Sequence, residues 1–319
     1  MLVRRILKGC AWVLILGPST ASPSAAQAPQ YLAQWGSVGG GDGQFYLPRS
    51  LATDAAGNVY VLDNNRIQKF SGTGVYLGQW GSSGNADGQF SIPTDVDTDA
   101  SGNVYVVDLG NRRIQKFTSN GMFLTKWNSY GAGSTPLTIT VGPAGDVYVV
   151  NASGRSIQRF TDTGTFLGEW GSFGSGPGQF LAPWGLATDA DGNVYAADTT
   201  AHRVQRFSGT GTYLGQWGSF GTGAGQFQFP HGVTVDAAGD IYVTDSHRVQ
   251  KFTGGGAYAA MWGTFGDGNG QFNHPWGVAV SLAGSIYVAD VTNCRIQVFG
   301  FAPVATKSTS WGRIKALYR

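Results

Sequence analysis

Gly57-Asn58-Val59-Tyr60-Val61-Leu62-Asp63 is the stretch that decides the fold of this chain. Arg66-Ile67-Gln68-Lys69-Phe70 follows it, and Trp80-Gly81 closes the unit. The block recurs along the 319 residues, and its tyrosines are 45, 43, 47, 47 and 45 residues apart. These tyrosines are Tyr60, Tyr105, Tyr148, Tyr195, Tyr242 and Tyr287. A repeat of this length indicates an architecture built from copies of one unit, so function must lie where the copies differ.

Each unit is predicted to form four strands, which in the first copy cover 50–53, 59–62, 67–70 and 75–80. The 50 glycines and the low share of charged residues, 13%, favour short strands and tight turns over helices. The second strand, 59–62, is apolar on both faces, which requires a sheet that packs between two others. Sheets arranged radially around an axis satisfy this requirement, and that architecture is the β-propeller.

The two ends of the chain predict how the ring closes. The segment 31–36 matches the fourth strand of a unit but has no unit before it, whereas the last unit stops after its third strand at Phe299. We therefore expect the N-terminal strand to complete the last sheet and cover its open edge. One tryptophan then belongs to each of six blades: Trp35, Trp80, Trp127, Trp170, Trp217 and Trp262.

These motifs resemble the NHL repeat family, whose units combine Val-Tyr-Val-x-Asp with Asn-x-Arg-Ile-Gln-x-Phe, and the likeness covers Tyr31 to Gly300. The chain resembles secreted bacterial NHL-repeat proteins. The resemblance implies an all-β, six-bladed NHL-type β-propeller with four antiparallel strands per blade. It leaves function open, because propellers of this family bind RNA, bind proteins, act as sensor domains or act as a lyase. The third unit departs from the pattern, since Ala132 and Gly133 replace the Gln and Phe of its Gly-Gln-Phe, so its rim is expected to be looser or recessed.

The sequence predicts three segments. Residues 1–28 read as a signal peptide, with Arg4, Arg5 and Lys8 before an apolar run and Ala26-Gln27-Ala28 as the cleavage pattern. Residues 29–300 form the propeller, and 301–319 form a basic tail that is either a docking signal or a frayed terminus. The protein is accordingly expected to be secreted or periplasmic, monomeric and without a transmembrane segment after cleavage. Cleavage would leave Cys294 as the sole cysteine.

The charge distribution argues against nucleic-acid binding. The formal charge is +2, but three basic residues lie in the predicted signal and four in the tail. The repeats themselves hold 14 basic and 19 acidic residues. A nucleic-acid partner would call for a basic stripe, and we expect none.

Residues that recur in every blade are interpreted as scaffold. An Asp at the end of the second strand and an Arg at the start of the third, such as Asp63 and Arg66, are expected to brace a turn as a charge-assisted pair. The run 189–193 resembles half of a calcium loop but lacks the later glutamate, so a turn is favoured. Asp95, Asp97 and Asp99 form a denser run assigned to an inner strand, where a channel-bound cation is an alternative.

The candidate site residues are those that break the repeat. Directly after the proline that opens each innermost strand stand Arg49, Thr94, Leu137, Trp184, His231 and Trp276. One comes from each blade, so they should surround the mouth of the central channel. The other histidines, His202, His247 and His274, fall in connections on the same side. The ligand-binding candidates are therefore Arg49, Thr94, Asp95, Trp184, His231, Trp276, His202 and His247.

Aromatic faces with a few polar groups suit a recognition site for a protein, peptide, glycan or small ligand. The alternative is that Trp184 and Trp276 plug the channel. Gly185 and Gly277 are expected to let a chain or ligand approach closely.

An enzymatic alternative comes from a more distant likeness to peptidyl-α-hydroxyglycine α-amidating lyase, a propeller of the same family. That resemblance implies zinc-binding histidines at the mouth positions of three blades, and only His231 matches. Asp95 matches a calcium-binding aspartate without its accompanying histidine. Lactonase-type propellers use a glutamate as a metal ligand, but Glu169 is assigned to an outer strand. We therefore expect no catalytic residues and no cofactor, with zinc or calcium at His231 or Asp95 as the alternative.

Overall fold

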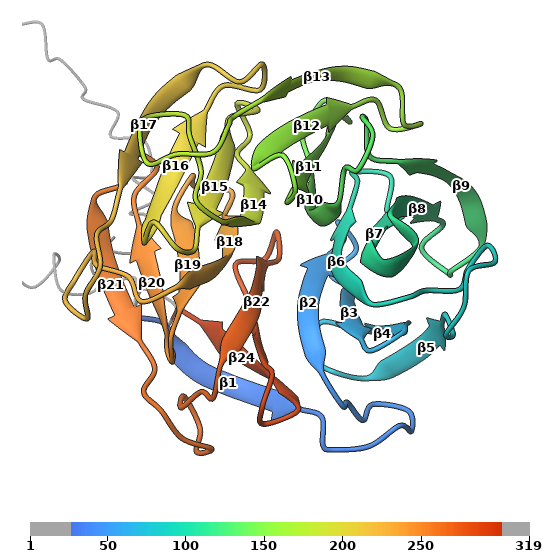
Figure 1. Ribbon diagram of the computed structural model, residues 1–319. Coiled ribbons are helices and arrows are strands. Elements are labelled where there is room, and N and C mark those ends of the chain that lie inside the picture. Colours follow the sequence, from blue (N-terminus) through green and yellow to red (C-terminus); the bar gives the residue numbers. More distant parts are fainter. Residues whose placement is uncertain (1–26, 302–319) are drawn as a thin grey trace, which may run out of the picture.

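The structure is a computed structural model that describes residues 27–301. Six four-stranded antiparallel sheets stand as blades around a central axis, as Figure 1 shows. The predicted all-β, six-bladed propeller is confirmed. The predicted signal peptide and basic tail lie almost wholly outside the described residues, so their boundaries remain predictions.

The innermost strand of every blade begins at a proline, whose missing N–H costs nothing on the unpaired channel edge. These strands are β2 (Pro48–Thr53), β6 (Pro93–Thr98), β10 (Pro136–Val141), β14 (Pro183–Thr188), β18 (Pro230–Val235) and β22 (Pro275–Val280). Each lies beside the innermost strands of both neighbouring blades, and β2 lies beside β22. The innermost strands therefore form a closed ring.

The second strand of every blade is buried on both faces, as its apolar sequence predicts. These strands are β3 (Val59–Asp63), β7 (Val104–Asp108), β11 (Val147–Asn151), β15 (Val194–Asp198), β19 (Ile241–Asp245) and β23 (Ile286–Asp290). The third strands are β4 (Arg66–Phe70), β8 (Arg113–Phe117), β12 (Ser156–Phe160), β16 (Arg203–Phe207), β20 (Arg248–Phe252) and β24 (Arg295–Gly300). One 3-10 turn, η1 (Leu109–Asn111), joins β7 to β8.

The outermost strands carry the blade tryptophans. They are β5 (Tyr76–Trp80), β9 (Phe123–Asn128), β13 (Phe166–Trp170), β17 (Tyr213–Trp217), β21 (Tyr258–Trp262) and β1 (Gln30–Trp35). The last of these is the N-terminal strand, which pairs with β24 so that Tyr31 lies opposite Phe299 and Trp35 opposite Ile296. The predicted closure of the ring by the first strand is confirmed.

The hydrophobic core lies between the blades. The ring of Trp80 is 6.1 Å from that of Tyr60 in its own blade and 6.0 Å from that of Phe117 in the next. Gly121, in the turn that follows Phe117, has φ +82° and lies against the face of Trp80, where a Cβ would come within 2.6 Å of the indole. The equivalent tryptophan fills the gap between two blades in each repeat, and for all of them except Trp262 a glycine of the next blade makes room.

Repeated polar residues brace the connections, as expected. Asp63 accepts the amide N–H groups of Tyr46 and Leu47 and pairs with Arg66 at 3.1 Å. Gln68 accepts from the amide of Gly43 at 2.9 Å and donates to a backbone carbonyl of the same loop. Asp189, in the proposed calcium-like run, accepts from Asn193 and from the Tyr195 hydroxyl. That run is a turn closed by Gly192, whose N–H donates to the Asp189 carbonyl.

Blade 3 rebuilds its missing contacts with other residues. Tyr130 stacks on Phe166 at a ring distance of 3.9 Å, and its backbone makes both bonds to Gln158 that the Gly-Gln-Phe loop makes elsewhere. Asn151 replaces the repeated Asp, and the blade's carboxylate comes instead from Glu169, which accepts from Asn151 and Gln158. Glu169 therefore serves the blade and does not line the channel. The expected local loosening is compensated by a shorter, differently packed loop.

No helix within residues 27–301 is long and apolar enough to cross a membrane.

Candidate functional site

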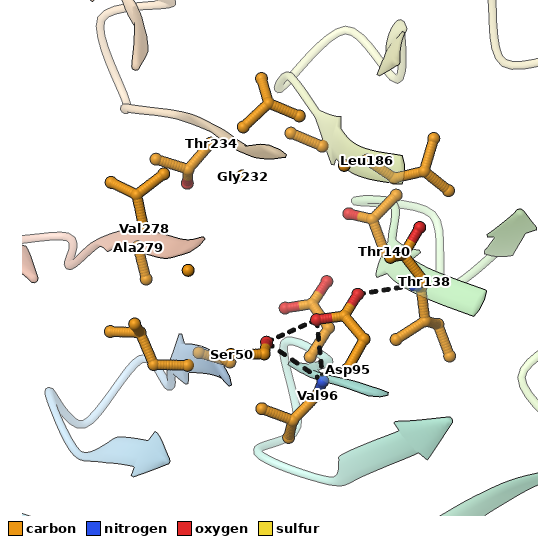
Figure 2. Close-up of a pocket in the computed structure, with 18 of the residues that line it drawn as sticks. Ser50, Asp95, Val96, Thr138, Thr140, Leu186, Gly232, Thr234, Val278 and Ala279 are labelled. Atoms are coloured by element: carbon orange, nitrogen blue, oxygen red, sulfur yellow. Dashed lines mark hydrogen bonds between the residues drawn. The ribbon is translucent and has the colours of Figure 1, made fainter. Parts of the chain in front are cut away.

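A cavity of about 230 Å³ follows the axis of the ring and is lined by the innermost strands. We call its upper rim the mouth, made of Arg49, Thr94, Trp184, His231 and Trp276. The sixth predicted position, Leu137, is buried and packs with the core between blades 3 and 4. Figure 2 looks into the cavity, with Ser50, Asp95, Thr138 and Thr140 on one side and Gly232, Val278 and Ala279 on the other. The repeat spacing thus located five of the six mouth positions in the channel.

Trp184, His231 and Trp276 are in contact. The ring of His231 lies 5.5 Å from that of Trp184, at an interplanar angle of 84°, and 5.5 Å from that of Trp276. The two indoles are 6.1 Å apart. The three residues come from β14, β18 and β22, the innermost strands of the consecutive blades 4, 5 and 6. The cluster therefore spans one half of the rim. Trp184 also packs on the core between blades 3 and 4, which fixes its base.

The glycines that follow these residues serve the strands and not a ligand. A Cβ on Gly185 would lie 2.0 Å from the carbonyl oxygen of His231, and a Cβ on Gly232 would lie 2.2 Å from that of Trp276. A Cβ on Gly277 would meet the carbonyl oxygen of Arg49 at 3.0 Å. The expectation that Gly185 and Gly277 admit a ligand is therefore corrected. They admit the backbone of the next blade, which draws the aromatic rings together.

Thr244 links the backbones of blades 5 and 6 beneath these aromatic residues. Its buried hydroxyl accepts the N–H of Gly232 at 2.8 Å and donates to the carbonyl of Trp276 at 2.7 Å. It therefore joins blade 5 to blade 6 directly beneath the aromatic cluster. Sequence reasoning missed Thr244, although it stands where the other blades carry Leu, Val or Ala, and this departure was the available signal.

His231 is an uncharged imidazole at neutral pH. Burial among the two indoles, followed by the charge of His274, lowers its pKa to about 4. Its Nδ1 is buried and has no hydrogen-bond partner among the described residues. A neutral imidazole with an unused nitrogen can donate or accept one hydrogen bond, depending on its tautomer.

Arg49 completes the rim from blade 1. Its guanidinium carbon lies 5.7 Å from the ring centroid of Trp276. Within the described part of the chain the side chain makes no ion pair or hydrogen bond, and its Nε is buried without a partner. Burial lowers the pKa of Arg49, yet an arginine retains its charge at neutral pH. The mouth therefore holds a cation with unused donors beside an aromatic face.

The opposite half of the channel is polar. Asp95 accepts from the Ser50 hydroxyl at 2.5 Å and from the amide of Ile139 at 2.8 Å. Asp97 accepts from the amide of Val141 at 2.8 Å. The two carboxylates of blade 2 thus satisfy channel-side N–H groups of blade 3. The mouth residue Thr94 is committed in the same way, because its hydroxyl donates to the Leu137 carbonyl at 2.5 Å.

Both channel carboxylates, Asp95 and Asp97, have raised pKa values. Burial, opposed by the hydrogen bonds from Ser50 and Ile139, raises the pKa of Asp95 to about 7. Burial likewise raises the pKa of Asp97 to about 6. Both groups still border the cavity. Asp95 is therefore partly protonated near neutral pH, which reduces the negative charge below the mouth.

The predicted acidic run is corrected at its third member. Strand β6 ends at Thr98, and Asp99 lies in the following turn, where it accepts from Asn103 and the Tyr105 hydroxyl. Only Asp95 and Asp97 face the channel. Among residues 27–301, no three His, Cys, Asp or Glu side chains are grouped closely enough to hold a metal ion. His231 and Asp95 accordingly do not share a ready-made ligand set for zinc or calcium.

His202 and His247 do not line the channel. The ring of His202 lies 4.9 Å from that of Phe220 and 5.0 Å from that of Phe229. The ring of His247 lies 4.9 Å from that of Phe265 and 5.0 Å from that of His274. Phe220 and Phe265 are 63% and 65% exposed. The two predicted site histidines therefore belong to the connections between the second and third strands of blades 4 and 5, separate from the Trp184–His231–Trp276 cluster.

The fold and cavity define a closed six-bladed propeller with one aromatic and one carboxylate half in its channel. Four segments match the family described as the NHL repeat: residues 90–117, 180–207, 227–252 and 272–299. Four of the six repeats therefore match the NHL repeat, as their motifs predicted. A comparison with curated protein sequences found no match.

Solved structures that share the fold are distant in sequence. A streptogramin B lyase is 16% identical, with 85% of this chain and 98% of that chain covered and a TM-score of 0.59. A gluconolactonase from Xanthomonas campestris is 15% identical, with coverages of 81% and 87% and a TM-score of 0.60. A protein of unknown function from Bacteroides thetaiotaomicron is 17% identical, with coverages of 84% and 76% and a TM-score of 0.64. At such identities the likeness shows the fold alone.

Proposed function

We propose that this protein is an exported, monomeric recognition module that binds a small ligand, a peptide or a glycan at the mouth of its channel. The observation that supports this role is the contact of Trp184, His231 and Trp276 above a cavity of about 230 Å³. These three residues interrupt an otherwise repeated scaffold. Rigid aromatic faces provide contact area at low entropic cost, and an unpaired imidazole nitrogen adds directional hydrogen bonding.

Two further observations support export and a monomeric state. The N-terminus resembles a signal peptide, and the last blade is completed by β1 of the same chain, so that the ring closes without a partner. Protein, peptide and glycan partners are all compatible with an aromatic rim. Nucleic acid is disfavoured because the repeats carry more acidic than basic residues.

Affinity capture tests the proposal. The wild-type protein, the double variant Trp184→Ala with Trp276→Ala, and the control Phe173→Ala are immobilised and exposed to an extract of exported material. Phe173 is a matched control because its ring is 64% exposed on a loop outside the cavity. Mass spectrometry should find the same small molecules or peptides on the wild type and the control, and lose them on the double variant. Equal capture by all three proteins, or none on the wild type, would contradict the proposal.

Folding must be checked in the same variants. Circular dichroism and the melting temperature distinguish loss of binding from loss of structure. If the double variant fails to fold, the tryptophans act as a channel plug, which is the structural alternative. Trp184→Phe and Trp276→Phe then repeat the binding test with less disturbance of packing.

The metal-dependent lyase alternative has little support from the residues at the mouth. Arg49, Thr94, Leu137, Trp184 and Trp276 occupy five of the six positions, and none of these is a good zinc ligand. Elemental analysis of the purified protein decides between the two functions. Stoichiometric zinc or calcium that survives dialysis would favour the lyase, whereas its absence would favour the recognition module.

A further inference from the structure

Arg49 is unlike the repeated arginines of the ring. Each of five of them, one in every blade except blade 3, pairs with the aspartate of its own blade; they are Arg66, Arg113, Arg203, Arg248 and Arg295. Arg49 has no such partner, and no carboxylate lies within ion-pair distance of it in the described residues. Leaving a partly buried guanidinium unpaired costs free energy. Such an arrangement is explained if a bound group supplies the missing charge.

The immediate surroundings leave Arg49 as the charge that a ligand would meet. His231 is neutral, and the Asp95 carboxylate is engaged by Ser50, Val96 and Ile139. The Asp97 carboxylate, which also borders the cavity, lies two residues further along β6 and accepts from the amides of Thr98 and Val141. The mouth thus presents one positive charge with no second cation beside it in the cavity lining. A single guanidinium matches a monoanion better than a dianion such as a phosphate ester. Its planar donors fit the two oxygens of a carboxylate.

The shape of the mouth adds a second requirement. The guanidinium lies beside the Trp276 ring at 5.7 Å, and the Trp184 ring lies 6.1 Å from Trp276. A flat apolar group next to the charge can stack against these rings. The cavity of about 230 Å³ is small against ordinary ligand sites, which span roughly 300–1,000 Å³. It suits a compact acid or the terminal residue of a chain.

We propose that the mouth binds a monocarboxylate that carries an adjacent aromatic group, with Arg49 pairing the carboxylate and Trp184 and Trp276 holding the ring. This inference rests on the proposed function, since it names the ligand class for the same site. Two sources share this chemistry: a free aromatic acid and a peptide that ends in an aromatic residue. The experiment has an arm for each.

Isothermal titration calorimetry with two acid–amide pairs, and with benzyl phosphate as a dianionic comparison, provides the test. The first arm compares N-acetyl-L-phenylalanine with its amide, and the second compares a tetrapeptide ending in phenylalanine with its C-terminal amide. In at least one arm the wild type should prefer the free acid by about tenfold or more, the change expected for one charge-assisted contact. Tighter binding in the peptide arm identifies a chain end as the source, and tighter binding in the first arm identifies a free acid.

Variants at position 49 test the residue itself. Arg49→Gln should bind acid and amide equally, because the charge is lost while the length of the side chain is largely kept. Arg49→Lys should retain part of the preference, because the charge remains without the planar fork. The Arg49 side chain makes no hydrogen bond or ion pair with the described residues and lies beside the Trp276 ring, so both variants should melt within about 2 °C of the wild type.

Three outcomes would overturn the ligand class: no detectable binding of either free acid, equal affinity for acid and amide in the wild type, or tighter binding of benzyl phosphate than of the carboxylate. An unchanged preference in Arg49→Gln would overturn the role of Arg49. These failures are separable from failure of the proposed function. If the affinity capture still depends on Trp184 and Trp276 while the acids are not preferred, the site stands and the ligand class is wrong.

Discussion

The two halves of the channel differ in how the innermost strands of neighbouring blades are joined. Blades 1, 2 and 3 place Ser50, Asp95 and Thr138 after the mouth residue, and each side chain bonds to the next blade. Blades 4, 5 and 6 place Gly185, Gly232 and Gly277 at the same position, and there the strand backbones approach directly. One half is joined by polar side chains and the other by close backbone contact.

This difference determines what the mouth can present. Where glycine brings the strands together, the preceding residues Trp184, His231 and Trp276 can touch across three blades. Where a polar side chain spans the gap, the preceding Thr94 is drawn into the same bonding and Leu137 is buried. The repeat scaffold thus places its aromatic mouth residues in the half where the blades are joined by backbone contact, and its polar side chains in the half where they bond to the next blade.

The largest expected effect comes from filling the glycine half. In Gly185→Ala the new Cβ would overlap the His231 carbonyl, with 2.0 Å between the two atoms, and only backbone movement can relieve it. We expect a loss of about 3 kcal/mol or more in the free energy of unfolding. Denaturant unfolding measures it. The control Gly168→Ala, where nothing lies within 4 Å of the added carbon, should change stability by less than about 1 kcal/mol. Equal costs in the two variants would remove the steric basis of the comparison.

A second prediction concerns the carboxylate half. The pKa of Asp95 is raised by burial to about 7, whereas an unfolded chain has about 3.8. The folded state therefore keeps the Asp95 proton to a higher pH than the unfolded chain does. The contribution of Asp95 to stability is accordingly greatest below about pH 4 and is lost as the pH rises through about 7. Asp95→Asn removes this titration. The difference in unfolding free energy between wild type and variant should shift against the wild type by about 2 kcal/mol from pH 5 to pH 8, because the cavity offsets part of the desolvation. A difference that is constant with pH would refute the assignment.

The aromatic half should titrate in the opposite direction. The pKa of His231 is lowered by burial to about 4, so protons bind the unfolded chain first as the pH falls below about 6.5. Relative to His231→Gln, the wild type should therefore lose about 1 kcal/mol between pH 7 and pH 4.5. Thermal melts across this range measure the shift. If both variants change with pH in the same direction, the two halves are not electrostatically distinct.

The smallest effect is expected at a single hydroxyl of the polar half. Ser50→Ala removes the bond to Asp95 but leaves the two amide bonds to that carboxylate. We expect a loss of about 1 kcal/mol, measured by denaturant unfolding at pH 7. A loss as large as that of Gly185→Ala would mean that Ser50, and not backbone approach, limits the stability of the ring.

The sequence predicted the fold because local patterns repeat. Strand positions, the closing strand predicted at 31–36 and found at Gln30–Trp35, and five of the six mouth positions follow from spacing, so they could be predicted without coordinates. The contacts between blades could not be read in this way. The overlap avoided at Gly185 and the bond from Ser50 to Asp95 depend on how far apart two strands lie, which spacing does not specify.

The sequence also did not reveal which residue replaces a missing contact, or which way a loop side chain points. Tyr130 supplies the backbone bonds to Gln158 that the missing Gly-Gln-Phe would have made, but only the structure identifies it. His202 and His247 share the face of the mouth in sequence, yet they contact exposed phenylalanines outside the cavity. For Tyr130 and for the two histidines alike, the contacts depend on the conformation of the loop, which the sequence pattern does not specify.

Indole N–H resonances provide the most direct test of the central claim that the aromatic half of the mouth is the binding site. In a ¹⁵N-labelled protein, the signals of Trp184 and Trp276 are assigned from Trp184→Phe and Trp276→Phe, and N-acetyl-L-phenylalanine is titrated in. We predict that these two signals shift with ligand concentration while those of the six blade tryptophans stay in place. Binding that leaves both channel signals unchanged, or that moves the blade signals instead, would contradict the account.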